Sequence, residues 1–99
     1  MAESRTFVTR LTPPGSGAIG VLAVEGPAAW ELVRQIFRPV AGSLPAIPEI
    51  GQTWVGVAGT EDMADECVLV ADALMPVPRA EIHCHGGKQV VAWLEETLQ

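Results

Sequence analysis

The 99-residue chain is poor in cysteine, basic side chains and long apolar runs. Its two cysteines, Cys67 and Cys84, are too few for a disulfide framework and do not form a Cys-x-x-Cys pair. No apolar stretch reaches membrane-spanning length, and the first residues lack the basic start and apolar run of a signal peptide. We therefore expect a single cytoplasmic domain over residues 1–99, with both thiols reduced and no membrane contact.

Positive charge is also scarce, because 6 basic residues face 12 acidic ones and the formal net charge is −6. The basic residues form no run or stripe, so we expect no direct contact with nucleic acid. The chain also lacks Gly-x-x-x-x-Gly-Lys-Ser/Thr and a Gly-x-Gly-x-x-Gly following a strand. The segment alone is therefore expected to bind no nucleotide and to catalyse no reaction.

Apolar residues, in contrast, make up 48% of the chain, with a mean hydropathy of +0.28. A chain of this length buries only about two-thirds of the surface that its unfolded form exposes. Its apolar content exceeds what one small core hides, which favours an interface between copies of the chain.

The apolar patterns predict two strands and a helix in the first half of the chain. Residues 7–11 alternate, and residues 18–24 form a continuous apolar run typical of a strand covered on both faces. Gly26-Pro27 marks the start of a helix that Arg38-Pro39 ends. Its apolar residues at helical spacing are Trp30, Val33, Ile36 and Phe37.

The second half predicts an irregular loop over residues 39–52 and then three strands, at 53–58, 67–74 and 81–85. A final helix carries the apolar residues Val90, Val91, Leu94 and Leu98. The order β-β-α-β-β-β-α predicts an α+β fold, with two helices packed on one mixed or antiparallel sheet.

The segment from Glu81 to Lys88 holds both histidines and one cysteine. On a strand, Glu81, His83 and His85 point to one face, where they could in principle ligate zinc. The alternative is that one histidine is buried and hydrogen-bonded while the other is solvated. Strand alternation directs Cys84 to the opposite face from His83 and His85, so neither histidine is placed to act as its general base. We expect Cys84 and Cys67 to be small apolar residues of the sheet interior.

The tryptophans leave two interpretations open. Trp30, Trp54 and Trp93 could form a surface on which a ligand stacks. Trp30 and Trp93 lie on or beside helical apolar stripes, where packing in the core is the usual role of an aromatic side chain.

Three ordered motifs resemble the N-terminal domain of the MnmE/TrmE tRNA modification GTPases. The first is Leu-Thr-Pro-Pro-Gly-Ser-Gly-Ala-Ile at residues 11–19, and the second is a strand that ends in Gly26-Pro27 before a helix. The third is Glu-Ile-His-Cys-His-Gly-Gly at residues 81–87. The acidic pair Asp65-Glu66 precedes an apolar strand that ends near a proline, as in the family. The resemblance extends from about Phe7 to Leu98.

This resemblance implies a folate-binding-domain-like unit that homodimerises. In the family, the paired domains bind a formyl-tetrahydrofolate, proposed as the one-carbon donor for modifying the wobble uridine of tRNA. The resemblance also implies a helical domain, a GTPase domain and the flavoprotein partner MnmG/GidA, if the chain is part of a full-length enzyme. The positions that match family motifs, and so imply the cofactor site, are Pro13, Pro14, Gly15, Cys84, His85, Gly86 and Gly87.

Two departures from the family pattern leave the function open between alternatives. No arginine occurs in residues 23–26, and residues 76–80 replace a longer loop containing Tyr-Thr-Gly-Glu-Asp. The chain is therefore either a homodimerising module with a formyl-tetrahydrofolate site, or an oligomerisation and interaction domain that binds no folate. A metal-binding domain that uses His83 and His85 is the third alternative. Each applies to a fragment of a GTPase or to a stand-alone relative.

Overall fold

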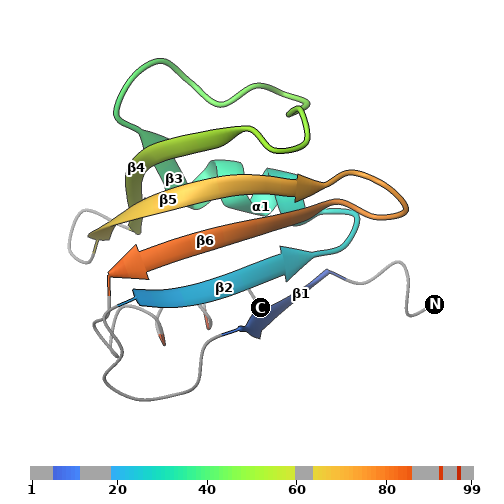
Figure 1. The fold of residues 1–99 in the computed structure, drawn as a ribbon, viewed down its shortest axis with the longest axis horizontal. Helices are drawn as coiled ribbons and strands as arrows, with labels where there is room; N and C mark the ends of the chain where they lie inside the picture. Colours follow the sequence, from blue (N-terminus) through green and yellow to red (C-terminus); the bar gives the residue numbers. More distant parts are fainter. Residues whose placement is uncertain (1–5, 12–18, 60–63, 86–91, 93–95, 97–99) are drawn as a thin grey trace.

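A computed structural model describes residues 6–11, 19–59, 64–85, 92 and 96 of the chain. In these residues, one six-stranded sheet with the order β1-β2-β6-β5-β4-β3 packs against one helix (Figure 1). Every strand pairing is antiparallel, which confirms the α+β class and the antiparallel form of the sheet. The elements are β1 (Phe7–Arg10), β2 (Ile19–Glu25), α1 (Ala29–Ile36), β3 (Phe37–Pro39), β4 (Thr53–Gly59), β5 (Ala64–Ala73) and β6 (Arg79–His85).

The helix α1 covers one face of the sheet, which we call the inner face. Leu22, Ile82 and Leu69 are register partners across β2, β6 and β5, and each is fully buried there. Trp30 of α1 lies 5.5 Å from Trp54 between ring centroids, and its Nε1 donates a hydrogen bond of 2.9 Å to the carbonyl of Pro45. The core role predicted for Trp30 is therefore confirmed, while Trp93 lies outside the described residues.

The end of the helix differs from the prediction. We expected Phe37 to be helical and residues 39–52 to be loop, but α1 ends at Ile36 and Phe37 begins β3. Phe37 has φ −111° and ψ 131°, and it pairs with Ala58. Proline disfavours the helical conformation in the residue before it, so Arg38 cannot continue the helix and the chain becomes extended. Phe37 is still 2% exposed, because the short strand turns its ring into the core.

The start of the helix also moves, from the predicted Pro27 to Ala29. Gly26 has φ 140°, a conformation that side chains rarely adopt, and its carbonyl accepts a hydrogen bond of 3.1 Å from the nitrogen of Ala29. Gly26 and Pro27 therefore form a turn that precedes the helix.

The strands begin and end within a few residues of their predicted positions, except that β5 begins at Ala64 rather than Cys67. The predicted second helix falls outside the described residues apart from Ala92 and Glu96, which are helical and exposed. In the part of the chain that the structure covers, no helix is long and apolar enough to cross a membrane.

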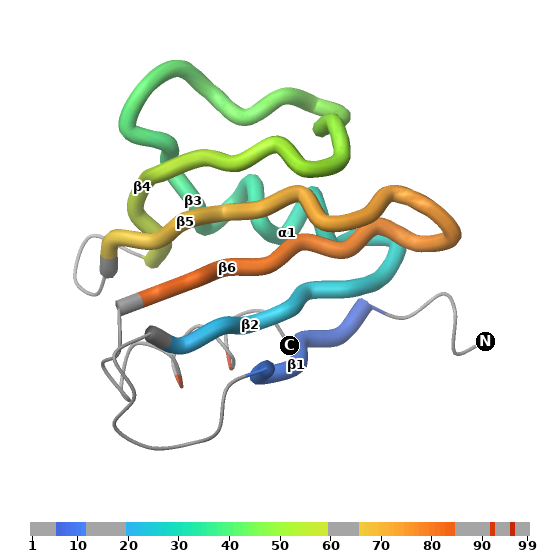
Figure 2. The backbone as a smooth tube through the Cα atoms, in the orientation of Figure 1, coloured from blue at the N-terminus to red at the C-terminus, as the bar shows by residue number. Residues whose placement is uncertain are grey.

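The last described strand lies in the middle of the sheet. β6 pairs with β2 on one side and with β5 on the other, so among the described strands the β1-β2 hairpin joins the rest of the sheet only through β6 (Figure 2). Ile19, at the start of β2, is the register partner of His85, at the end of β6. Glu25 and Arg79 are partners at the opposite end.

Candidate functional site

Alternation along β6 separates its reactive side chains as the sequence predicts. Ile82 and Cys84 point into the inner face, where they are 0% and 1% exposed. Glu81 and His83 lie on the opposite face of the sheet, which we call the outer face. Cys84 and Cys67 are both buried core residues, so their predicted place in the sheet interior is confirmed.

The outer face carries an ion-pair cluster centred on Arg79, the first residue of β6. Its guanidinium reaches three carboxylates, each from a different part of the sheet. Nε lies 2.6 Å from Oδ2 of Asp72, Nη2 lies 3.2 Å from Oε2 of Glu81, and Nη1 lies 3.5 Å from Oε1 of Glu25. With three carboxylates and one guanidinium, this cluster has a net charge of about −2.

The surroundings of Arg79 stabilise its charged form. Burial by itself lowers the pKa of Arg79, but the hydrogen bonds and charges of Asp72 and Glu81 outweigh burial and raise that pKa above its ordinary value. The guanidinium is thus a permanent cation whose hydrogen-bonding capacity is largely used inside the cluster.

His83 extends the cluster along the outer face. Its Nε2 lies 3.1 Å from Oε1 of Glu81, whose other oxygen binds Arg79. The side chain is 35% exposed, so His83 is not the buried histidine of the predicted pair. Because the side chain of His85 lies outside the described structure, the expectation that one histidine is buried stays a prediction. His83 is partly exposed on the outer face, so its imidazole contacts both Glu81 and solvent.

Apolar side chains surround this polar group on the same face. Val55 and Val68 are register partners on β4 and β5, and their exposed fractions are 57% and 38%. Phe7 on β1 is 49% exposed, and Leu11, just after β1, is 45% exposed. The outer face therefore combines large exposed apolar groups with one acidic cluster, a pattern typical of an interaction surface.

The residues predicted to bind a cofactor are only partly within the described structure. Pro13, Pro14, Gly15, Gly86 and Gly87 lie outside it, as does the side chain of His85. The pairing of Ile19 with His85 nevertheless brings the points from which both motifs continue to one end of adjacent strands. Cys84 is buried on the inner face and paired with residues of both neighbouring strands, so its side chain does not face a ligand on the outer side.

Sequence reasoning missed Arg79, Asp72 and Glu25 as members of a cluster. Arg79 precedes Glu81 by two residues and so shares its face, which was readable from the sequence. The contribution of Asp72 and Glu25 depends on how β5 and β2 align with β6. No pattern within one strand specifies that register.

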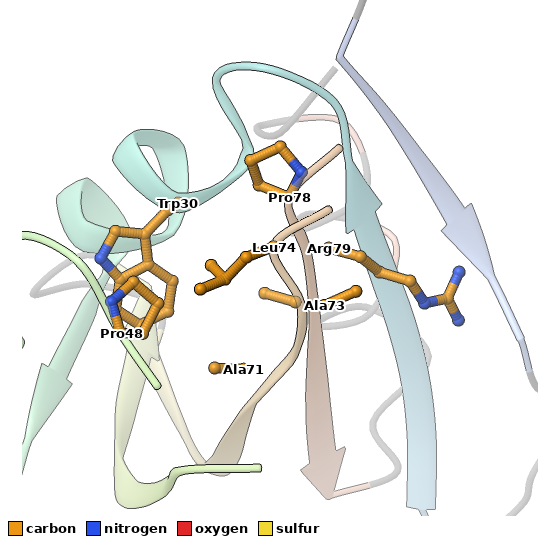
Figure 3. Close-up of a pocket in the computed structure, with 8 residues that line it drawn as sticks. Trp30, Pro48, Ala71, Ala73, Leu74, Pro78 and Arg79 are labelled. Carbon is orange, nitrogen blue, oxygen red and sulfur yellow. The ribbon is translucent and has the colours of Figure 1, made fainter. Parts of the chain in front are cut away.

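Two hollows in the described part of the chain lie away from the predicted cofactor position. A hollow of about 10 Å³, next to Trp30, Leu74 and Pro78, has room for about one water molecule, and Arg79 extends away from it (Figure 3). A second hollow, of about 290 Å³, lies beside the edge strand β3 and is lined in part by Arg34 and Arg38. Neither lies at the end of β6 where the predicted cofactor residues begin.

The described residues contain no group of three or more histidine, cysteine, aspartate or glutamate side chains placed to hold a metal ion. Glu81 and His83 share a face as the zinc alternative requires, but they are hydrogen-bonded to each other. The third ligand of that alternative, His85, has no described side chain, so zinc binding stays a prediction.

No family model matches the chain, but individual proteins do. It is 35% identical over 102 residues to the tRNA modification GTPase MnmE of Nitratidesulfovibrio vulgaris (strain DP4), covering 93% of this chain and 21% of that protein. Its identity to MnmE of Thermotoga maritima is 36% over 90 residues, covering 87% of this chain and 19% of that protein. For MnmE of Heliobacterium modesticaldum, the identity is 33% over 103 residues, covering 94% and 21%.

The chain thus spans about a fifth of the length of the curated relatives that it matches. The similarity covers most of its own length, including the segments of the three motifs. The resemblance to MnmE predicted from those motifs is confirmed.

Proposed function

We propose that this chain, an MnmE-type domain by its similarity to these relatives, is a homodimerising module of a tRNA modification GTPase. The observation that carries the proposal is the outer face of the sheet. There Phe7, Leu11, Val55 and Val68 leave large apolar areas exposed to water. Covering such a surface with a second copy removes apolar area from water, which drives association.

The faces of the sheet suit this contact better than its edges do. Edge strand β3 has only three residues, one of them Pro39, which has no N–H to donate to a neighbouring strand. Edge strand β1 has four residues. Such short edges offer few backbone hydrogen bonds for pairing with another chain.

Charge sets the orientation of the proposed contact. The Arg79 cluster has a net charge of about −2 and lies at one end of the outer face. A two-fold axis through the Val55 and Val68 region brings like apolar residues together. It also keeps the two acidic clusters apart, which avoids repulsion between buried like charges.

The dimer is tested by sedimentation equilibrium on wild-type protein and on Val55→Glu. Glutamate at this half-exposed position places a charge in the proposed interface but costs the monomer little. We expect the dimer dissociation constant to rise at least tenfold, equivalent to about 1.4 kcal/mol.

Ile47→Glu is the matched control, because Ile47 is 79% exposed in the connection between β3 and β4, where Pro45 and Pro48 lie next to Trp30 of the helix that covers the inner face. The control should leave the dissociation constant unchanged. A wild-type chain that stays monomeric at high concentration, or an equal effect of both variants, contradicts the proposal.

A second proposal is that the dimer binds 5-formyl-tetrahydrofolate near the end of β6. The pairing of Ile19 with His85 supports it, because the segments carrying Pro13 to Gly15 and Gly86-Gly87 adjoin these partners in the sequence. The Arg79 cluster is not part of this proposed site, because Arg79 pairs with Glu25 at the opposite end of β2 and β6 from Ile19 and His85. Its guanidinium, which already binds three carboxylates, is therefore not available to the anionic glutamate tail.

Calorimetric titration tests the folate proposal with two ligands. We expect heat and a thermal shift with 5-formyl-tetrahydrofolate, and no response to p-aminobenzoylglutamate, which keeps the tail but lacks the ring. If millimolar 5-formyl-tetrahydrofolate gives neither heat nor a thermal shift, the folate proposal is wrong. The chain is then an interaction domain that binds no folate. Binding of the tail fragment alone would show that the ring is not the recognised part.

A further inference from the structure

Cys67 and Cys84 are direct register partners on the adjacent strands β5 and β6. Both side chains point into the inner face, where the residues are 3% and 1% exposed. Their sulfur atoms are not joined by a disulfide. The two thiols are thus buried next to each other in the centre of the sheet, although they are separated in the sequence.

Backbone hydrogen bonds show whether Cys67 and Cys84 form a hydrogen-bonded or a non-hydrogen-bonded pair of the ladder. Ala71 donates to the carbonyl of Gln52 at 2.9 Å and accepts from the nitrogen of Gly51 at 2.7 Å, so its backbone groups point towards β4. These directions alternate along a strand, and the pairing of β5 is regular from Cys67 to Ala71. Cys67 therefore also points its backbone groups towards β4, away from Cys84.

Cys67 and Cys84 consequently form a non-hydrogen-bonded pair of the antiparallel ladder. In such pairs the Cα atoms lie about 4.5 Å apart, closer than in hydrogen-bonded pairs. Disulfides span Cα separations of about 4.4–6.8 Å. The backbone thus already has the separation that a disulfide requires, at the short end of the range.

The neighbouring positions in the same row are both glycines. Gly20 is the partner of Cys84 on β2, and Gly56 is the partner of Cys67 on β4. Neither glycine places a side chain beside the cysteines.

We propose that Cys67 and Cys84 are a modification site, a dithiol that closes to a cross-strand disulfide on reaction with a peroxide. One thiolate attacks the peroxide, becomes a sulfenic acid and releases water after protonation. The second thiol then displaces the sulfenic oxygen as another water, which forms the S–S bond. Two thiols and one hydrogen peroxide thus yield one disulfide and two waters, and the peroxide takes the two electrons.

Burial and geometry determine how this site behaves. The sulfurs are covered, so an oxidant reaches them when β5 and β6 open locally. In the same opened state a small thiolate can attack the disulfide and reduce it by thiol–disulfide exchange. The modification is therefore reversible by small thiols. This inference depends on neither the dimer nor the folate site.

The experiment treats native wild-type protein with hydrogen peroxide, blocks remaining thiols with N-ethylmaleimide under denaturing conditions, and measures the intact mass. We expect both alkylation sites to be lost together, with a mass lower by two hydrogens than the reduced chain. A peptide map should link the peptides that contain Cys67 and Cys84, and dithiothreitol should restore both alkylations. The protein should migrate as a single chain on a non-reducing denaturing gel.

The single variants Cys67→Ser and Cys84→Ser serve as controls, since each leaves one thiol that has no partner for an intrachain bond. Their remaining thiol should keep its alkylation or gain oxygen, without the loss of two hydrogens. The proposal is overturned if oxidised wild-type protein keeps both alkylations, carries only sulfinic or sulfonic acids, or forms only disulfides between chains. The wild-type measurement decides this even where a serine variant does not fold.

Discussion

The two faces of the sheet place neighbouring residues of one strand in opposite environments. On β5, Leu69 is 0% exposed against the helix, while Val68, the preceding residue, is 38% exposed on the outer face. On β6, Ile82 is fully buried, while the side chain of His83 is 35% exposed. Burial of the inner-face side chains therefore supplies most of the stability of the fold. The partly exposed side chains of the outer face are the ones that a partner can contact.

The sharpest test of this difference substitutes adjacent residues of β5. Leu69→Ala should lower the free energy of unfolding by about 2–5 kcal/mol, because it removes buried methyl groups and leaves a cavity. Val68→Ala should lower it by less than about 1 kcal/mol, since much of its side chain is already in water. Urea denaturation at low protein concentration, where dimerisation does not contribute, measures both. Equal losses in the two variants would show that the faces do not differ as described.

A second test crowds the inner face near its edge. An alanine Cβ at Gly56 would meet the carbonyl oxygen of Arg38 and the Cα of Pro39 in β3, both nearer than 3.0 Å. These are backbone atoms, so β3 itself must shift, and Gly56→Ala should cost about 1–3 kcal/mol. Thermal unfolding measures the loss. Val55→Ala, one residue away on the outer face, is the control and should change stability less.

The smallest expected effect concerns the charges of the outer face. Arg79→Met leaves Glu25, Asp72 and Glu81 without their shared cation, which should cost about 1 kcal/mol because these groups are partly exposed. Salt at about 1 M should shrink the difference from wild type, since it shortens the screening length to about 3 Å. Arg79→Lys keeps the charge but loses the planar guanidinium, so its free energy of unfolding should lie between those of wild type and Arg79→Met.

The pH dependence of this contribution follows from the raised pKa of Arg79. A cation whose pKa is higher in the folded state stabilises the fold below the unfolded pKa and loses that effect as pH rises through the folded value. The contribution from Arg79 protonation should therefore stay constant from neutral to moderately alkaline pH and fall only in strongly alkaline solution. A loss between neutral and mildly alkaline pH, measured by urea denaturation, would contradict this assignment.

Local patterns in the sequence predicted the parts of the fold that one strand or helix determines. Alternation along residues 81–85 placed Cys84 with Ile82 in the core and Glu81 with His83 on the other face, as observed. The end of the helix was not predictable in the same way. Phe37 fits the apolar spacing of the helix, but it is the first residue of β3, and its ring is buried from that strand instead. The apolar pattern alone does not distinguish these two conformations.

The candidate site depended on information that no single strand contains. Arg79 contacts Asp72 from β5 and Glu25 from β2, so the cluster exists only because three strands align in one register. The pairing of Cys67 with Cys84 is another product of register. The cofactor role of Pro13, Pro14, Gly15, Gly86 and Gly87 remains a prediction, because these residues lie outside the described structure.

The central place of β6 has a consequence for how the chain folds. Arg79 and Glu25 are 54 residues apart in the sequence, yet their strands are neighbours. During synthesis, the edge of β2 that pairs with β6 stays unpaired until β6 has been made. Such long-range pairing slows folding and leaves strand edges exposed on the nascent chain. The β1-β2 hairpin is therefore the part of the domain for which a chaperone has most time to bind.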